Sequence, residues 1–564
     1  MADEQGGSCL RTLSFCILAI NIFSLAVGHK SISEEMDEFI KTVMECRKVP
    51  GLTLTVVLDK TELSQGYGLS DVKTGRKVDD ETLFCIGSLT KSFTTALLAD
   101  LLVDNNLNIR SCDWDIKLKE ILQHFQSADD YRTSEMTLKD ILTHRSGLES
   151  IDFGIHVGYP TITREQLCRK LKHLKESHLF RDQFSYNNLL YMLAGHVAEV
   201  IGNDTWEHLI QTRIFDKYNM VSSAVYEDSL MAKNTAIPYI YDSIEDELHD
   251  VQNLTKMYPA DPAGSIFTNS KDMKIWLSHL LSLFDEHLAS EYCHRTTFNK
   301  VITASDYGDV FQKYKAPELD VKYHACGYAL GWFVSNYKGY EIITHNGDIY
   351  GYSSLIVLIP SIKFALYGNT NGPGGEEGII ALQQIAYYML DVFALHETPW
   401  TNMSTACAHP MAFPYNYTDA LVGKSGHGIL NPERYTGIYG HPIIGDMTIA
   451  YIKDEDVLMC RMGYKFKGYM LRESDNMFFV SPDGVIKYLY EIRGGQVGLF
   501  FDNTTLTEEG LFENVTLKFS IAGYEFSRRI RFSNEVINSS SRLSDVSWVF
   551  LFPVVVFYSV FDKN

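Results

Sequence analysis

A serine followed three positions later by a lysine is the pairing in this sequence best suited to nucleophilic chemistry. It occurs three times, as Ser70 with Lys73, Ser88 with Lys91, and Ser335 with Lys338. The first and third pairs lie in segments typical of turns or hairpins. Only Ser88 follows a strand-like segment and a glycine at the start of a predicted helix. This local context selects Ser88 and Lys91 as the candidate pair.

The geometry of a helix gives this pair its chemistry. Positions i and i+3 share one face, so the amine of Lys91 can reach the hydroxyl of Ser88. Burial in an apolar site lowers the pKa of a lysine toward neutrality and makes it a usable base. The helix N-terminus and the N–H of Ser88 would stabilise negative charge on an attacked carbonyl oxygen. The pair therefore predicts a serine nucleophile; the alternative for an isolated Ser-x-x-Lys is an exposed helix surface.

The elements that must position the pair belong to residues 32–395, where strand-like and helical segments alternate; we call this region the mixed body. Residues 52–58 alternate apolar and β-branched side chains, which is typical of a strand. Residues 91–102 and 189–201 have helical periodicity, and Gly202 stands where a helix would stop. Such mixing predicts an α/β or α+β fold. The sequence contains no G-x-S-x-G elbow, no H-E-x-x-H motif and no phosphate-binding Walker loop.

Six segments, in order along the chain, resemble the serine β-lactamase-like family. This family includes class C β-lactamases, certain D-alanyl-D-alanine carboxypeptidases and related esterases. The segments are Phe84–Thr95, Met136–Leu148, Phe184–Gly195, Ala263–Asp272, Gly327–Trp332 and Thr344–Tyr352. The resemblance implies a β-lactamase/transpeptidase-like fold, in which helices pack on an antiparallel sheet. It also implies a serine hydrolase that needs no cofactor and no metal.

The resemblance implies a role for each matched residue. Ser88 would be the acylated nucleophile and Lys91 its general base. Tyr186 would relay a proton to the leaving group, with its phenol pKa held down by Lys91. Asn188 would hydrogen-bond Lys91 and a substrate amide. The backbone N–H groups of Ser88 and Asp348 would form the oxyanion hole.

The segment from Thr344 onward departs from the family pattern. His345 stands where class C β-lactamases have the lysine of K-T-G, and it would help to hold a substrate carboxylate. The altered triplet favours peptidase or esterase chemistry over antibiotic hydrolysis. The carboxylate of Asp348 would disfavour an anionic substrate. Taken singly, Tyr186 and His345 are also compatible with structural roles, and His144 is expected to be a structural hydrogen-bonding residue at a helix end.

Both ends of the chain carry features of the secretory route. Residues 1–28 have the basic residue, apolar run and small residues of a signal peptide. Residues 538–564 end in a hydrophobic tail that resembles a GPI-attachment signal; the alternative is a retained hydrophobic terminus. Eight cysteines follow the signal, a number that permits disulfides without fixing their pairing. Seven glycosylation sequons begin at Asn203, Asn253, Asn402, Asn416, Asn503, Asn514 and Asn538.

Beyond the mixed body the pattern changes to short strands. Residues 396–430 contain several prolines and two sequons, which predict an exposed linker. Residues 431–530 predict a small all-β domain, a barrel or sandwich that resembles the lipocalin-like domain of some family members. Among its expected strands are residues 447–452, 477–480, 487–492 and 515–521.

The composition limits the classes of partner that the protein is expected to bind. The 564 residues carry a net charge of −21, which disfavours nucleic acid and anionic lipid. No Cys/His cluster has zinc-ligand spacing and no EF-hand occurs, although acidity alone is compatible with Ca²⁺. We therefore expect a secreted, extracellular serine hydrolase acting on a small-molecule or peptide substrate. The alternative is a non-catalytic acidic matrix protein bound to a shell or another calcium-rich mineral, as the related mollusc gigasins suggest.

Overall fold

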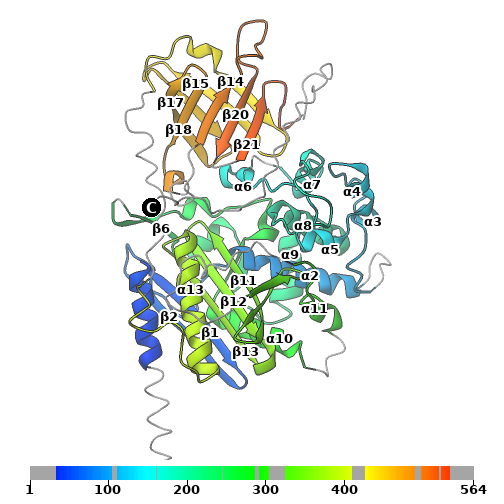
Figure 1. Ribbon diagram of the computed structural model, residues 1–564, viewed down its shortest axis with the longest axis vertical. Coiled ribbons are helices and arrows are strands. Elements are labelled where there is room, and N and C mark those ends of the chain that lie inside the picture. The colour runs from blue at the N-terminus through cyan, green and yellow to red at the C-terminus, as the bar shows by residue number, and fades with distance from the viewer. Residues whose placement is uncertain are drawn as a thin grey trace, which may run out of the picture.

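The computed structural model describes residues 34–104, 111–159, 162–243, 245–285, 291–303, 324–408, 426–488, 497–519 and 522–533. The predicted signal peptide, the C-terminal tail and the sequons at Asn416 and Asn538 lie outside these residues. Among the described residues, no helix is both apolar enough and long enough to span a bilayer. In Figure 1 the chain forms two bodies, a mixed helix-and-sheet body and a barrel above it.

An eight-stranded antiparallel sheet forms the centre of the first body, in the order β3-β2-β1-β13-β12-β11-β10-β9. Its first and last strands in sequence come together because β1 pairs with β13, Leu52 opposite Thr370. Side chains alternate between the two faces of the sheet. The strands are β1 (Gly51–Leu58), β2 (Thr61–Asp71), β3 (Arg76–Lys77), β9 (His324–Tyr328), β10 (Phe333–Tyr337), β11 (Tyr340–Ile349), β12 (Tyr352–Ile359) and β13 (Phe364–Thr370).

Helices cover both faces of this sheet. On one face, α13 and the helix at residues 34–46 pack together, with Phe39 stacked on Tyr388 at 3.9 Å. On the other face, α10 packs against α2 through Trp276, whose ring lies 4.6 Å from that of Phe93. The helices are α2 (Thr90–Asp104), α3 (Leu118–Ile121), α4 (Asp130–Glu135), α5 (Leu138–Leu142), α6 (Phe153–Val157), α7 (Arg164–Cys168), α8 (Asn188–Gly202), α9 (Trp206–Ile210), α10 (Ser270–Ser282), α11 (Tyr292–Thr296) and α13 (Gly375–Met389).

Short strands and turns complete the first body. A small sheet is formed by β4 (Phe84–Cys85), β5 (Ala224–Val225) and β8 (Ile266–Thr268). A separate hairpin is formed by β6 (Tyr239–Asp242) and β7 (Glu247–Asp250). Two 3-10 turns near the site are η1 (Gly87–Leu89) and η6 (Asp261–Ala263). The predicted strand at 52–58 and the two predicted helices are present. The second helix, α8, extends through Gly202, and Asn203 takes the left-handed cap position with φ +52°.

The all-β domain is a closed eight-stranded barrel, drawn in orange and yellow in Figure 1. Closure brings β14 next to β21, with Gly440 opposite Ser527, and so leaves no edge strand unpaired. One predicted strand is wrong in its described part, because residues 486–488 form a helical turn. The strands are β14 (Gly437–His441), β15 (Gly445–Ile452), β16 (Val457–Met462), β17 (Phe466–Ser474), β18 (Met477–Pro482), β19 (Val497–Phe501), β20 (Asn514–Phe519) and β21 (Ala522–Ser527).

The first part of the predicted linker belongs structurally to the first body. A disulfide joins Cys407 to Cys46 of the first helix, and Ala406 is buried. The carbonyl of Ala406 accepts a hydrogen bond of 3.1 Å from Gln384 on α13. Proline content predicted an exposed segment, and most of residues 396–408 are exposed; the covalent bond to a distant cysteine is not visible in local composition. A second disulfide joins Cys112 to Cys293.

The barrel packs on the first body next to α6. Phe153 of α6 lies 5.7 Å from Phe519 and 5.8 Å from Tyr524 of the barrel, measured between ring centroids. The hairpin between β16 and β17 also reaches the first body, where the backbone N–H of Lys465 donates to the carbonyl of Val157 at 2.9 Å. One continuous apolar cluster includes residues of both bodies.

Candidate active site

A tight turn places Ser88 at the entrance to α2. Gly87 has φ +50°, and a Cβ built on it would lie 3.0 Å from the backbone nitrogen of Asp348. The turn therefore needs glycine both for its left-handed backbone and for its close approach to β11. Ser88 is partly exposed, whereas its neighbours Gly87 and Leu89 are buried. Ser88 therefore lines a pocket, while its buried neighbours hold the turn in place.

Lys91 lies one helical turn after Ser88 and is fully buried. Its Nζ is 3.0 Å from the Oγ of Ser88 and donates to Asn188 Oδ1 at 2.7 Å and to the carbonyl of Ala263 at 2.8 Å. Burial lowers the pKa of Lys91 to about 7, and the negative charge of Asp152 works in the opposite direction. A substantial share of neutral amine is therefore present near pH 7.

Asp152 completes a chain of polar groups that begins at Ser88. Asn188 donates from Nδ2 to Asp152 Oδ2 at 2.9 Å while its Oδ1 accepts from Lys91. Asn188 is thereby held in one amide orientation. Sequence analysis missed Asp152, because it lies in no recognisable motif and reaches Asn188 only through the fold.

Tyr186 lies beside Lys91, as the resemblance implies. The Nζ of Lys91 is 4.9 Å from the centroid of the Tyr186 ring, and the ring of His144 lies 4.2 Å from it, tilted by 33°. The backbone N–H of Asn187 donates to Nδ1 of His144 at 3.0 Å, just beyond the end of α5. His144 therefore anchors the segment that carries Tyr186 and Asn188.

His345 is buried in β11 among aromatic side chains. Burial, with a further contribution from Lys91, lowers its pKa to about 3, so the imidazole is neutral. Its Nδ1 lies 2.6 Å from the carbonyl of Asn346 and must carry the proton. Its Nε2 lies 3.0 Å from the hydroxyl of Tyr328, which then donates. Any contribution of His345 to holding a carboxylate would therefore come from hydrogen bonding and not from charge.

The predicted oxyanion-hole donors lie on two adjoining elements. The pairing of β11 with β10 ends at Thr344, and the following residues of β11 pass beside η1. Ser354 of β12 donates to the carbonyl of Ile86 at 2.7 Å, which fastens the sheet to the turn before Ser88. The close approach of Gly87 to Asp348 places the nitrogen of Asp348 next to the Ser88 turn.

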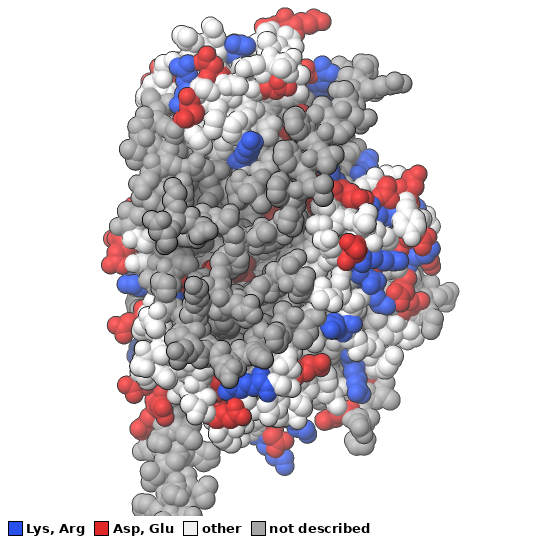
Figure 2. Space-filling view, viewed as in Figure 1, with Lys and Arg blue, Asp and Glu red and all other residues white. Residues whose placement is uncertain are grey.

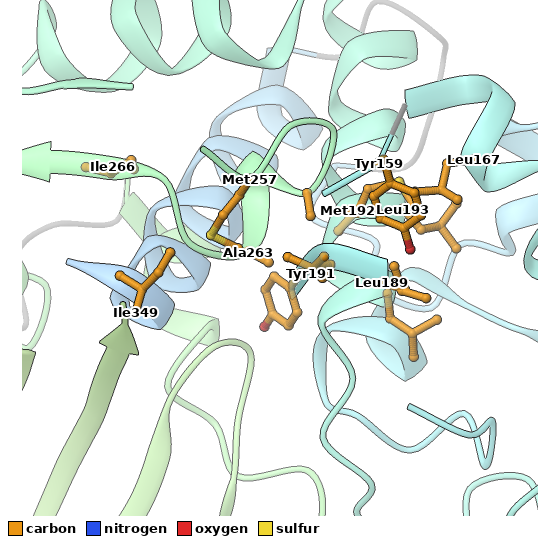
Figure 3. Packing of buried hydrophobic residues seen from close by; sticks show 14 of the residues in the cluster. Tyr159, Leu167, Leu189, Tyr191, Met192, Leu193, Met257, Ala263, Ile266 and Ile349 are labelled. Atoms are coloured by element: carbon orange, nitrogen blue, oxygen red, sulfur yellow. The ribbon is translucent and has the colours of Figure 1, made fainter. Parts of the chain in front are cut away.

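An open pocket lies in front of Ser88. Figure 3 shows Met257 and Ala263 close together beside α8, and Ile349 at the end of β11. Among the described residues that line the pocket there is no lysine or arginine, but there are two carboxylates, Asp152 and Asp348. The lining residues are Gly87, Ser88, Asp152, Ile155, His156, Asn188, Met257, Ala263, Gly264, Asp348, Ile349 and Tyr350.

The other two Ser-x-x-Lys pairs have no such setting. Ser70 lies in β2, not in the predicted loop, and donates to the carbonyls of Arg76 and Lys77. Ser335 lies in β10, and Lys338 pairs with Asp391 at 2.7 Å. In both pairs the serine lies in a strand and the lysine lies in the turn that follows.

The comparisons with known proteins agree with this geometry. The model of the Beta-lactamase family matches residues 36–389, and the chain belongs to this family. It is 25% identical over 441 residues to "Unguisins hydrolase ungD'" of Aspergillus campestris, covering 76% of this chain and 79% of that protein. It is 25% identical over 245 residues to "Gigasin-6" of Magallana gigas, covering 42% of this chain and 78% of that protein.

The fold comparison extends over both bodies. The octameric penicillin-binding protein homologue from Pyrococcus abyssi has a TM-score of 0.55 at 20% identity, covering 88% of this chain and 99% of that chain. The predicted fold and the predicted class, a serine hydrolase of the β-lactamase-like family, are thus confirmed.

Proposed function

We propose that the protein hydrolyses an amide, peptide or ester through an acyl-enzyme on Ser88. Neutral Lys91 takes the proton of the Ser88 hydroxyl as Oγ bonds to the substrate carbonyl carbon. The backbone N–H groups of Ser88 and Asp348 stabilise the resulting oxyanion. Collapse breaks the bond to the leaving group, which receives a proton through Tyr186 or Lys91. Water then attacks the acyl carbon and gives a proton to Lys91, and Lys91 passes this proton to the Oγ of Ser88 as the bond from Oγ to the acyl carbon breaks.

One observation supports this proposal above the others. The amine of Lys91 is buried, has a pKa of about 7 and lies 3.0 Å from the Oγ of Ser88. A general base works best when its pKa is near the working pH. A lysine on a helix surface would instead keep its ordinary pKa and remain protonated.

The pocket suggests the charge of the substrate. Asp152 and Asp348 contribute negative charge, His345 is neutral, and the described lining holds no fixed cation. We infer that the group beside the scissile carbonyl is neutral or carries an amine, and that anionic acyl groups are disfavoured. Replacement of Asp348 by Asn should improve hydrolysis of an anionic ester relative to its neutral counterpart.

We also propose that the protein is secreted. The two disulfides support this, since such bonds persist mainly in oxidising compartments. Of the five sequons in described residues, Asn203, Asn253, Asn402 and Asn503 are exposed, and Asn514 is partly buried. Attachment through residues 538–564, and association with matrix or mineral, rest on the sequence alone. Size analysis of the secreted protein before and after removal of N-glycans tests the assignment.

The test of the acyl-enzyme is the intact mass of the purified protein after incubation with a fluorophosphonate and, separately, a penicillin. A stoichiometric adduct that is lost in Ser88→Ala would establish a working nucleophile. No adduct with either reagent, in protein shown to be folded by circular dichroism, would favour the alternative of a matrix scaffold.

A further inference from the structure

Three metal-ligating side chains converge at the ends of two helices, away from the pocket. His279 lies in the last turn of α10, and Glu291 and His294 lie at the start of α11 and within it. One nitrogen of each imidazole and one carboxylate oxygen all lie within 4.8 Å of one another. The Nε2 of His294 is 3.9 Å from the Oε2 of Glu291.

The two imidazoles do not use all of their hydrogen-bonding capacity within the described residues. The Nε2 atoms of His279 and His294 are both buried, and neither has a hydrogen-bond partner among the described residues. Buried polar atoms are nearly always paired, because leaving one unpaired costs free energy. An imidazole nitrogen that has no hydrogen-bond partner can offer its lone pair to a cation.

The helices that carry the cluster are held by other contacts. The disulfide of Cys293 with Cys112 fixes α11. The Nε1 of Trp114 donates to Oγ1 of Thr296 at 2.9 Å at the other end of this helix. Close to the cluster, Lys217 is paired with Asp100 at 2.7 Å, so its positive charge is largely balanced. These contacts hold the ligand-bearing helix α11 in place without a metal ion.

We propose that His279, Glu291 and His294 bind one divalent transition-metal ion, with Zn²⁺ as the best match. Two imidazoles and one carboxylate suit Zn²⁺, whereas Ca²⁺ and Mg²⁺ prefer oxygen ligands. Water would occupy a fourth position. Zinc bonds of about 2 Å require the three donors to draw closer together than in the metal-free arrangement. The ion would link α10 to α11 and support the fold without taking part in chemistry at Ser88.

Sequence analysis expected no metal, for a physical reason. His279 is twelve positions before Glu291, and the only close pair is Glu291 with His294 at a spacing of three. Neither spacing forms a recognised zinc motif. Only the packing of α10 beside α11 brings the third ligand into place.

The test uses the full-length protein carrying no polyhistidine tag, stripped of metal by a chelator and dialysed against Zn²⁺ alone. Metal analysis should find one Zn²⁺ per chain, and Co²⁺ should give the visible absorption of a low-coordinate site. His279→Gln and Glu291→Gln should each weaken binding at least tenfold. The exposed His208, paired with Asp204, provides the matched control His208→Gln, which should bind as the parent does.

A second cluster, Asp242, Glu245 and His249, could take up the ion instead. His249→Gln separates the two sites. Binding that survives in His279→Gln and Glu291→Gln, or that is lost only in His249→Gln, would overturn the proposal. Thermal unfolding gives an independent readout: Zn²⁺ should raise the Tm of the parent and not that of Glu291→Gln. Circular dichroism of each variant shows whether it is folded, and so prevents misfolding from being scored as loss of the site.

Discussion

In the proposed mechanism Lys91 is the residue that governs reactivity, and its environment predicts how the reaction depends on pH. Burial lowers its pKa to about 7, and the neutral amine is the active form. The rate of Ser88 labelling by a fluorophosphonate should therefore be low at pH 5, rise through pH 7 and level off above pH 8. A rate that falls over this range would contradict the role of Lys91 as the base.

Removal of the base should have a large and specific effect. Lys91→Ala should slow acylation by about 10²–10⁴-fold, the usual contribution of a general base. Lys73→Ala is the matched control, because Lys73 also belongs to a Ser-x-x-Lys pair but lies on an exposed turn. Rapid-quench labelling followed by intact mass measures both variants. Equal losses in the two would show that the pairing around Ser88 has no special role.

Asp152 should affect the pKa of Lys91 without itself acting as the base. Its carboxylate raises the pKa of Lys91, so Asp152→Asn should lower that pKa and move the rise in labelling rate to lower pH. The new side chain can still accept the hydrogen bond from Asn188 Nδ2. The pH profile of labelling is the measurement. A shift to higher pH would contradict the electrostatic account.

At the scale of single residues, the sequence predicted those contacts of the site that join residues close together in the chain. Ser88 and Lys91 are three residues apart on one helix, so their proximity follows from helical periodicity. Asp152 could not be found in this way, because 36 residues separate it from Asn188. The neutral state of His345 depends on burial by several strands, which residue type alone does not indicate.

At the scale of elements, the turn at Gly87 holds the site against β11. Gly87→Ala would place a Cβ 3.0 Å from the nitrogen of Asp348, in a backbone conformation that alanine adopts poorly. We expect labelling of Ser88 to slow at least tenfold, and Tm to fall. Gly75→Ala is the control, since Gly75 also has a positive φ (+73°) but nothing lies within 4 Å of its added Cβ.

The comparison of these two variants separates backbone strain from steric contact. Strain alone would affect the stability of both and the labelling rate of neither. An unchanged labelling rate in Gly87→Ala would show that the approach of β11 to the turn is unimportant for the nucleophile. The residues themselves predicted the strand, the glycine and the helix in this order, whereas the approach of the strand that carries Asp348 was implied only by the family resemblance.

At the scale of the whole molecule, the barrel and the first body share an interface next to the pocket. The Nζ of Lys465 donates to the carbonyls of Leu254 and Lys256, at 2.7 and 2.5 Å. It also lies 4.7 Å from the ring of Tyr350, which lines the pocket. The hairpin of the barrel therefore supports one wall of the site.

Loss of this contact should weaken the molecule measurably. Lys465→Met should lower the free energy of unfolding by about 1–3 kcal/mol, because two carbonyls lose their donor. Lys467→Met, at an exposed residue paired with Asp483, should change it by less than about 0.5 kcal/mol. Urea unfolding measures both variants. Equal effects would show that the hairpin is an incidental contact.

The surface charge also belongs to this scale. Among the described residues on the face shown in Figure 2, acidic and basic side chains are interspersed. The pattern of short strands predicted a small all-β domain after the mixed body, as a barrel or a sandwich, and the structure shows a closed barrel. The sequence could not predict that residues near Cys407 return to the first helix, because a disulfide between distant cysteines leaves no local pattern.

The central claim is that Ser88 is the residue that becomes acylated. The most direct test is peptide mass mapping of the intact protein after reaction with a fluorophosphonate, with Ser88→Ala treated in parallel. The account predicts a single modified peptide with the added mass on Ser88, and no modification in the variant. An adduct on another residue, or labelling that persists in Ser88→Ala, would contradict it.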